Sequence, residues 1–185
     1  MKRTVLFLAV ICLLFGCGAA EQGMDQALSF RNSLTNAKGC TFKATVTADY
    51  QDVYYDFTMD CRMDAAGAVA FEVVEPASIC GITGSISDSE GKLTFDDKVL
   101  LFATLAEGQI TPVSAPWLFI NTLRSGYIKG CAQEGNAVVL HVNDSYADDA
   151  IQLSIKLLDA IPVYAEIFWQ NRRVITIAVE DYCFL

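Results

Sequence analysis

Residues 40–63, CTFKATVTADYQDVYYDFTMDCRM, are the stretch that decides the fold class. Apolar and polar side chains alternate along both halves, with a polar turn between them at residues 49–52. This period of two is typical of two antiparallel strands that have one apolar and one polar face. The stretch therefore predicts a long amphipathic β-hairpin and a chain that is mostly β.

The register of this hairpin also bears on two cysteines. A turn at residues 49–52 pairs Ala48 with Val53, and the same register sets Cys40 directly opposite Cys61 on the apolar face. Directly opposed Cβ atoms lie about 4.5–5.5 Å apart, whereas a diagonal pair is too distant for easy bridging. We therefore expect a Cys40–Cys61 disulfide, with two buried thiols as the alternative.

The rest of the chain extends the pattern into a larger sheet with two helices. Period-3.6 patterning and end signals predict helices over residues 24–39 and 114–126. Further strands are expected at 79–87, 91–97, 98–105, 126–132, 136–143, 150–158, 163–170 and 173–182. The expected fold is α+β and mostly β. It is a large curved antiparallel sheet, an incomplete β-barrel, with an N-terminal helix and a second helix packed in or on its concave face.

The first sixteen residues have the layout of an export signal. Two basic residues precede the apolar run VLFLAVICLLFG, which is shorter than the roughly 20 residues that cross a bilayer. The end of this run together with Cys17, LLFGC (13–17), resembles a bacterial lipobox, in which the cysteine sulfur receives a lipid and the chain is cut before it. Phe15 is bulkier than the usual residue there, and an uncleaved anchor or plain secretion are the alternatives. We expect a signal peptide (1–16), a lipidated tether beginning at Cys17 (17–23) and one domain (24–185).

The charge of the chain limits what it binds. The net charge is −9, and without residues 1–16 it is 11 − 22 = −11, because two of the 13 basic residues lie in the signal. Nucleic acids and anionic lipid surfaces require clustered Lys and Arg, so neither is an expected partner of the domain itself. Attachment to the membrane is therefore assigned to the lipid on Cys17, with the domain on the outer side of the bacterial cell membrane.

Little in the sequence points to catalysis or to a metal. The single histidine, His141, sits in a strand pattern and is expected at or near the surface. Residues 143–149, NDSYADD, lack the spacing of a calcium loop and are expected as a solvated turn. Glu166 lies among apolar residues, where it is either functional or the partner of a basic residue across the strand. No CxxC spacing is present, so no metal and no cofactor are expected. The pairing of Cys80, Cys131 and Cys183 stays open.

The order of elements resembles the LolA/LolB-like superfamily of lipoprotein carriers and lipid-binding lipoproteins. An N-terminal helix, the long hairpin, EPASICGITGSISDSEGKLTF (75–95), a helix entered through APW and the closing PVYAEIFWQNRRVITIAVEDY (162–182) support it. The resemblance implies a half-open barrel around a helix, with an apolar cavity for a lipid or acyl chain. No basic residue that would hold an acyl chain is identified, since Lys43 and Arg62 fall on the polar face.

The leading hypothesis is thus a non-enzymatic, membrane-anchored bacterial lipoprotein that binds a lipid or acyl chain in the half-barrel. The alternative is a cell-surface scaffold that docks a partner protein of the envelope and has no lipid ligand. The residues expected to line the cavity are apolar positions of the concave face and of the second helix. They are Phe42, Val46, Phe57, Met59, Phe71, Val73, Trp117 and Ile120.

Overall fold

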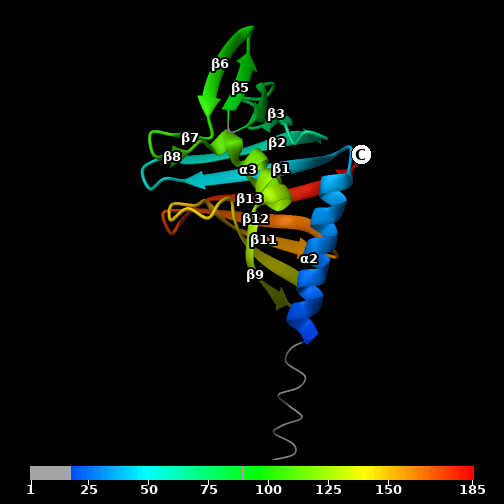
Figure 1. Ribbon diagram of the computed structural model, residues 1–185. Coiled ribbons are helices and arrows are strands. Elements are labelled where there is room, and N and C mark those ends of the chain that lie inside the picture. Colours follow the sequence, from blue (N-terminus) through cyan, green and yellow to red (C-terminus); the bar gives the residue numbers. More distant parts are fainter. Residues whose placement is uncertain (1–17, 89) are drawn as a thin grey trace, which may run out of the picture.

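The structure is a computed structural model that describes residues 18–88 and 90–185. The expected signal peptide (1–16) and the expected lipid site at Cys17 lie outside these residues. The described chain forms an eleven-stranded antiparallel sheet, a short two-stranded ribbon and two α-helices (Figure 1). None of the described helices has the length and apolar character that a membrane span needs.

The strands follow the order β6-β5-β4-β3-β2-β1-β13-β12-β11-β10-β9 across the sheet. Their bounds are β1 Gly39–Asp49, β2 Tyr54–Asp64, β3 Val69–Glu75, β4 Thr83–Ser87, β5 Glu90–Phe95, β6 Lys98–Ala103, β9 Tyr127–Glu134, β10 Ala137–Asn143, β11 Gln152–Leu158, β12 Ile161–Trp169 and β13 Arg172–Phe184. The ribbon pairs β7 (Leu105–Ala106) with β8 (Gln109–Ile110). Short turns join most neighbours, which is the connection that antiparallel strands allow.

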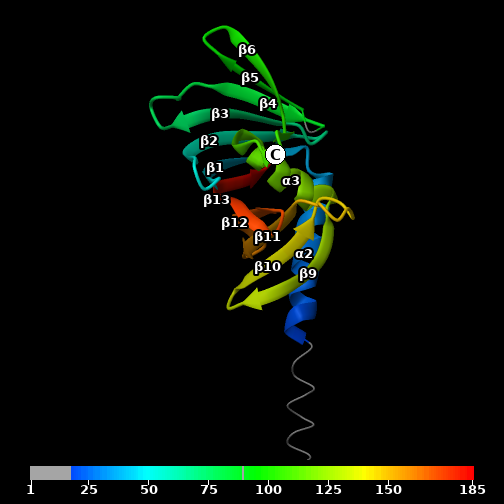
Figure 2. The ribbon, with the colours of Figure 1, turned by 90° about the vertical axis from the view of Figure 1, so that its left-hand side faces the viewer.

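The sheet curves around its helices without closing into a barrel (Figures 1 and 2). β1 pairs with β13 in its middle, while β6 and β9 form its two separate edges. The long connection from β6 to β9 carries β7, β8, a short 3-10 helix η1 (Pro112–Ser114) and α3 (Ala115–Ser125). The expected fold class, an incomplete barrel with two helices, is confirmed.

The N-terminal helix α2 spans Gly18–Asn36, so it begins six residues before the expected Met24 and includes residues assigned to the tether. Its buried stripe is formed by Ala27, Phe30 and Leu34. Leu28 is exposed, because the spacing of three and four residues along this stripe places Phe30 on the buried side. α2 lies along one end of the strands β9 and β10 (Figure 1).

The second helix α3 forms where the sequence predicts it, with Pro116 in its first turn and Gly126 as its C-cap. Ser114 precedes the helix, but its hydroxyl donates to the Thr111 carbonyl oxygen at 2.6 Å and does not cap the helix. The described residues 115–120, 122 and 123 are all buried. A helix that is buried on nearly every side belongs inside a core, and α3 fills the concave face of the sheet.

The β1–β2 register differs from the expected one, and the Cys40–Cys61 disulfide is wrong. Ala48 pairs with Tyr55, so Cys40 faces Met63 while Cys61 faces Phe42, which makes the two cysteines diagonal neighbours. Both are buried free thiols, in agreement with the alternative that the sequence left open. The turn lies one residue along from the expected one, and the Tyr50 amide closes it by donating to the Val53 carbonyl oxygen at 3.0 Å. The Tyr50 hydroxyl also donates to the carbonyl oxygen of Ile110, far along the chain.

Burial also sets the chemistry of these two thiols. It raises the pKa of Cys61 well above that of a free cysteine, and the neighbouring Asp60 carboxylate raises it further. Burial raises the pKa of Cys40 as well, although the adjacent Tyr182 hydroxyl offsets part of that effect. Both thiols are therefore poor nucleophiles, since thiolate is the reactive form. Cys80 and Cys183, by contrast, are exposed free thiols.

Candidate functional site

The concave face, where the sequence predicts a ligand cavity, is filled by the protein's own side chains. Six of the eight expected cavity residues are almost fully buried in the core and line none of the main pockets of the described chain. They are Phe42, Val46, Met59, Phe71, Val73 and Ile120. Phe119 of α3 meets Phe42 edge to face, with ring centroids 5.9 Å apart. The half-barrel is therefore plugged by α3.

The plug is attached to the rest of the domain at its C-terminal end. Arg31 of α2 donates from Nε to the Leu123 carbonyl oxygen at 2.7 Å and from Nη2 to that of Thr122 at 3.4 Å. Both carbonyls lie near the C-terminal end of the helix, which attracts a cation, and that of Thr122 also accepts the Gly126 amide at 2.8 Å. Burial lowers the pKa of Arg31 from its ordinary value. Arg124 adds a hydrogen bond to the Ala65 carbonyl oxygen at 3.1 Å.

A pocket remains at the other end of α3, at the mouth of the half-barrel. This mouth pocket has a volume of about 420 Å³. Its lining comes from the first half of α3, from the β6–β7 segment, from the β10–β11 loop and from the end of β12. The residues are Ala103, Thr104, Leu105, Trp117, Leu118, Asn121, Asp144, Ser145, Asp149, Ile151 and Trp169. Trp117 is thus the one expected cavity residue of α3 that reaches a pocket.

Two contacts give the mouth pocket a fixed wall. The Trp169 indole Nε1 donates to the Gly108 carbonyl oxygen at 2.9 Å, which ties the β7–β8 turn to the end of β12. The Tyr50 hydroxyl holds the carbonyl oxygen of Ile110 in the same ribbon. A short ribbon of two residue pairs has little stability alone, so these two aromatic side chains position it beside Trp117.

The rim of the mouth pocket is polar and acidic. Asp144 accepts a hydrogen bond from the Ile151 amide at 2.9 Å, which closes the loop between β10 and β11. Asp149 and Ser145 complete this side of the rim, and no basic residue is among the lining residues. The described residues contain no group of carboxylates, histidines or thiols arranged for a metal ion. The pocket therefore combines an apolar floor with an acidic rim.

Phe57, the remaining expected cavity residue, borders a different hollow of about 660 Å³ between β2 and the β3–β4 connection. Asp56, Glu75 and Cys80 also line it, and Phe57 itself is buried. The expected cavity residues are therefore not brought together around one space. Of the two hollows, the mouth pocket is lined by more apolar side chains, including two indole rings.

The polar residues that the sequence singled out do not form a catalytic group. His141 is exposed on β10, as expected for a surface histidine. The Glu166 carboxylate accepts a hydrogen bond from Arg173 Nη1 at 2.7 Å, so Glu166 has the basic cross-strand partner that the simpler interpretation predicted. His141 and Glu166 border one shallow hollow with Lys129, but Arg173 already neutralises the carboxylate.

Most residues of the mouth pocket carry no recognisable signal in the sequence. Leu105, Ile151 and Trp169 lie in three separate segments, and each has the pattern of an ordinary strand end. One available signal was composition, since the chain has two tryptophans and both line this pocket. Their convergence depends on strand curvature and on the position of α3, which local patterns do not encode.

No protein-family model and no curated protein matches the chain. Solved structures do match it. A DUF1329 family protein from Desulfovibrio piger has a TM-score of 0.50 at 7% identity, with 90% of this chain and 93% of that chain covered. At this identity the likeness concerns the fold alone.

Two further matches have lower TM-scores. A LolA superfamily protein from Nitrosomonas europaea has a TM-score of 0.45 at 10% identity, covering 85% of this chain and 91% of that chain. The lipoprotein LppX from Mycobacterium tuberculosis has a TM-score of 0.43 at 11% identity, covering 90% and 96%. The architecture expected from the sequence, an open antiparallel sheet with two helices, is confirmed by the strand order and the elements of the described chain.

Proposed function

We propose that this protein is a lipid-anchored binding protein of the bacterial cell envelope, without catalytic activity. Its mouth pocket holds the apolar chain of a lipid or acyl group. The observation that carries this proposal is the mouth pocket itself, where Trp117, Trp169 and neighbouring aliphatic side chains face an opening at the end of a plugged half-barrel.

The size and the chemistry of the mouth pocket support an apolar chain as its ligand. Its volume of about 420 Å³ lies in the usual range of ligand sites, about 300–1,000 Å³. Trp117 and Leu118 form a buried floor, so a chain inserted there leaves water. The interior below is filled, so the chain lies at the mouth and does not run through the barrel. The acidic rim favours a zwitterionic head group over an anionic one.

The lipid anchor is supported by the LLFGC stretch. The early part of α2, around Gly23, lies near Cys131 and Val138 at the β9 edge. Mass spectrometry of protein extracted from membranes should find the added lipid on Cys17. If Cys17→Ser protein stayed fully in the membrane fraction, another anchor would be needed.

Tryptophan fluorescence provides a direct test of the mouth pocket, because both tryptophans of the chain line it. A monoacyl phosphatidylcholine with bromine on its chain, below its micelle concentration, should quench the emission in a saturable way. The unlabelled lipid should compete and restore it. Linear, unsaturable quenching would contradict the proposal.

Matched leucine variants locate the site. Leu105 lines the mouth pocket and is 41% exposed, so Leu105→Glu places a charge in the pocket without disrupting the core. Leu100→Glu introduces the same charge at an exposed position outside it. The charge introduced into the apolar wall by Leu105→Glu should weaken lipid binding at least about tenfold. Leu100→Glu should leave the affinity for the lipid unchanged. Equal affinities in both variants would place the lipid elsewhere.

A further inference from the structure

The β5–β6 hairpin projects from the body of the domain, and its apolar side chains are not covered. Its turn residues Asp96 and Asp97 both have positive φ, 53° and 62°, which is the geometry of a tight two-residue hairpin turn. On β6, Val99, Leu100 and Leu101 are 56%, 62% and 76% exposed. Figures 1 and 2 both show this hairpin at the end of the molecule farthest from the start of α2. Three successive exposed apolar residues are unusual for a surface strand.

β6 is also an unpaired edge of the sheet. Its only partner in the described sheet is β5, and Phe95 pairs with Lys98 next to the turn. In an antiparallel pair, hydrogen-bonded and non-hydrogen-bonded residues alternate, so the main-chain groups of Val99, Leu101 and Ala103 point away from β5. The Ala103 carbonyl oxygen confirms this parity, because it accepts a hydrogen bond from the Thr111 hydroxyl at 2.6 Å.

The edge lacks the usual protection against strand pairing. Natural edge strands carry charges, prolines or bulges that prevent another chain from adding to them. β6 has Lys98 beside the turn and no other charge, and its pairing with β5 runs over six residue pairs without a bulge. Val99 and Leu101 therefore present main-chain donors and acceptors between exposed apolar side chains.

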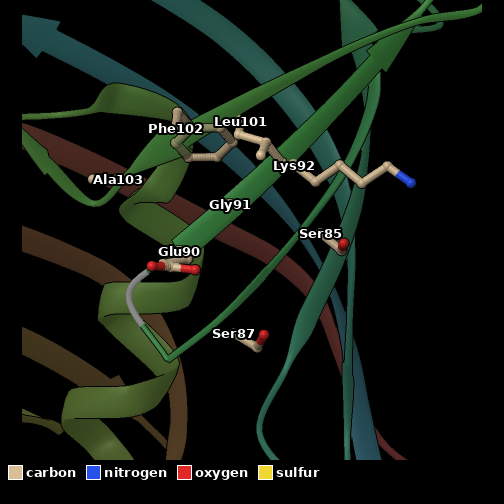
Figure 3. Close-up of a pocket in the computed structure, with 8 residues that line it drawn as sticks. All are labelled: Ser85, Ser87, Glu90, Gly91, Lys92, Leu101, Phe102 and Ala103. Carbon is tan, nitrogen blue, oxygen red and sulfur yellow. The ribbon is translucent and has the colours of Figure 1, made fainter.

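A hollow lies beside this edge, where it can accept side chains of a strand that pairs with β6 (Figure 3). It has a volume of about 450 Å³ and is lined by residues of β4, β5 and β6, with Leu101 next to Lys92 across the strands. Glu90 lies on the same face, two residues before Lys92. Within the described part of the chain, neither charge is in an ion pair. A strand added to β6 would place alternate side chains over this hollow.

We propose that β6 is a docking edge for an extended segment of another envelope protein, apolar at alternate positions and basic at its ends. The segment adds to the sheet as a twelfth strand, with main-chain hydrogen bonds to Val99 and Leu101. Its apolar side chains cover Val99 and Leu101, which lie on one face of β6. Its basic ends face the Asp96–Asp97 turn and the acidic surface of the chain.

Charge favours this partner over the two other possible occupants of an exposed apolar hairpin, a second copy of the chain and a membrane surface. Two copies of the chain each carry a net charge of −9, so electrostatic repulsion opposes their association through a single edge strand. A membrane surface is usually anionic, and the tip that would enter it carries two adjacent carboxylates. A basic peptide is attracted by both features, so charge complementarity selects it.

The position of the edge fits a partner that lies away from the membrane. Ten strand spacings of about 4.8 Å separate the two edges, so β6 lies up to about 48 Å from β9 along the curved sheet. The start of α2 is at the β9 edge. In this respect the inference uses the proposed anchor at Cys17, whereas the pairing chemistry of β6 does not depend on it.

The experiment uses the purified protein and a synthetic probe, a peptide of alternating valine and threonine with lysines at both ends. Titration calorimetry should show saturable binding, and hydrogen exchange should show new protection of the Val99 and Leu101 amides. The Leu100 amide, which already bonds to β5, should not change. A peptide with glutamates in place of the lysines should bind at least about tenfold more weakly.

Matched changes at one position test the main-chain pairing. Leu101→Pro removes an outward-facing amide and spares the bonds to β5, whereas Leu101→Val keeps the amide and an apolar side chain. Affinity should fall at least about tenfold in the first variant and stay within about threefold in the second. A peptide N-methylated along one edge should also fail to bind, and this control leaves the protein unaltered.

Several outcomes would overturn the proposal. These are no binding of the lysine-flanked peptide, equal binding of the glutamate-flanked peptide, or unchanged binding by Leu101→Pro. A concentration-dependent dimer that Leu101→Pro abolishes would assign the edge to a second copy. Binding to anionic vesicles that Leu101→Glu abolishes would assign it to a membrane. Leu105→Glu should bind the peptide normally, so failure of lipid binding at the mouth pocket and failure of docking at β6 are distinguishable.

Discussion

The filled half-barrel makes a quantitative prediction at Phe119. This side chain is 0% exposed at the centre of the plug, and its ring meets Phe42 edge to face. Replacing a buried phenylalanine by alanine costs about 3–5 kcal/mol, and an edge-to-face pair adds about 0.5–1.5 kcal/mol beyond area burial. We therefore expect Phe119→Ala to lower the free energy of unfolding by about 4–5 kcal/mol.

If the interior around Phe119 were an open lipid cavity, Phe119→Ala would lower the free energy of unfolding by less. If Phe119 lined an existing space, its removal would create little new cavity, and the loss would approach the transfer term alone, about 1.5–3 kcal/mol. Urea denaturation at 25 °C measures the difference, provided that the slope with denaturant stays unchanged. Small domains have about 5–15 kcal/mol of stability, so the variant should still be measurable if the parent lies in the upper part of this range.

Phe95→Ala is the matched control, because Phe95 is 51% exposed at the end of β5. It should cost less than about 1 kcal/mol. A second measurement uses the new space itself, since a cavity lined by apolar side chains stays dry and takes small apolar molecules. Benzene should therefore raise the denaturation midpoint of Phe119→Ala and leave the parent unchanged. A loss below about 2 kcal/mol, with no benzene effect, would refute the plugged interior.

Three further predictions concern the attachment of α3, the thiols and the mouth. Arg31→Met should cost about 1–2 kcal/mol in urea denaturation, because it removes the charged donor to Leu123 at the end of α3. Cys80 should react with a thiol reagent at once in the native protein, whereas Cys61 should react only at the rate of opening. Burial, and to a lesser extent the charge of the neighbouring Tyr55 phenol, raises the pKa of Tyr50 to about 12. The stability from its neutral form should be complete below pH 10 and disappear as pH rises to about 12.

Each of these has a control and a contrary result. Arg31→Lys keeps the charge and should recover part of the loss, and an equal loss in both variants would mean that packing of the side chain matters more than its charge. Peptide mapping after brief labelling identifies the reactive cysteine, and early labelling of Cys61 would contradict its burial. For Tyr50→Phe, ultraviolet titration should lack one phenol step near pH 12. An unchanged titration curve would contradict the assignment.

Alternation along residues 40–63, the two 3.6-period stretches and the turn signals were enough to determine the fold class, because each is a local pattern. They predicted a mostly-β chain and the position of α3. Of the two alternatives that the sequence left open for Glu166, the structure shows the pairing with a basic residue. In each case the backbone geometry or the polarity of near neighbours decides the outcome.

The register of the first hairpin was decided only in the tertiary structure. Ala48 pairs with Tyr55 and not with Val53, which places Cys61 diagonal to Cys40. Tyr50 beside this turn also contacts Ile110, 60 residues away. A shift of one residue in a turn has little energetic consequence for the local strand pattern. The alternation of apolar and polar residues alone therefore does not select the register.

The contents of the half-barrel were likewise decided by packing. The sequence identifies apolar side chains such as Phe42 and Phe119, but it does not say whether they face a ligand or each other. The mouth pocket and the β6 edge result from how far a curved sheet closes and where α3 lies within it. Local periodicity determines which side chains turn inward. The space left between them depends on contacts among segments far apart in the chain, and only the tertiary structure determines those contacts.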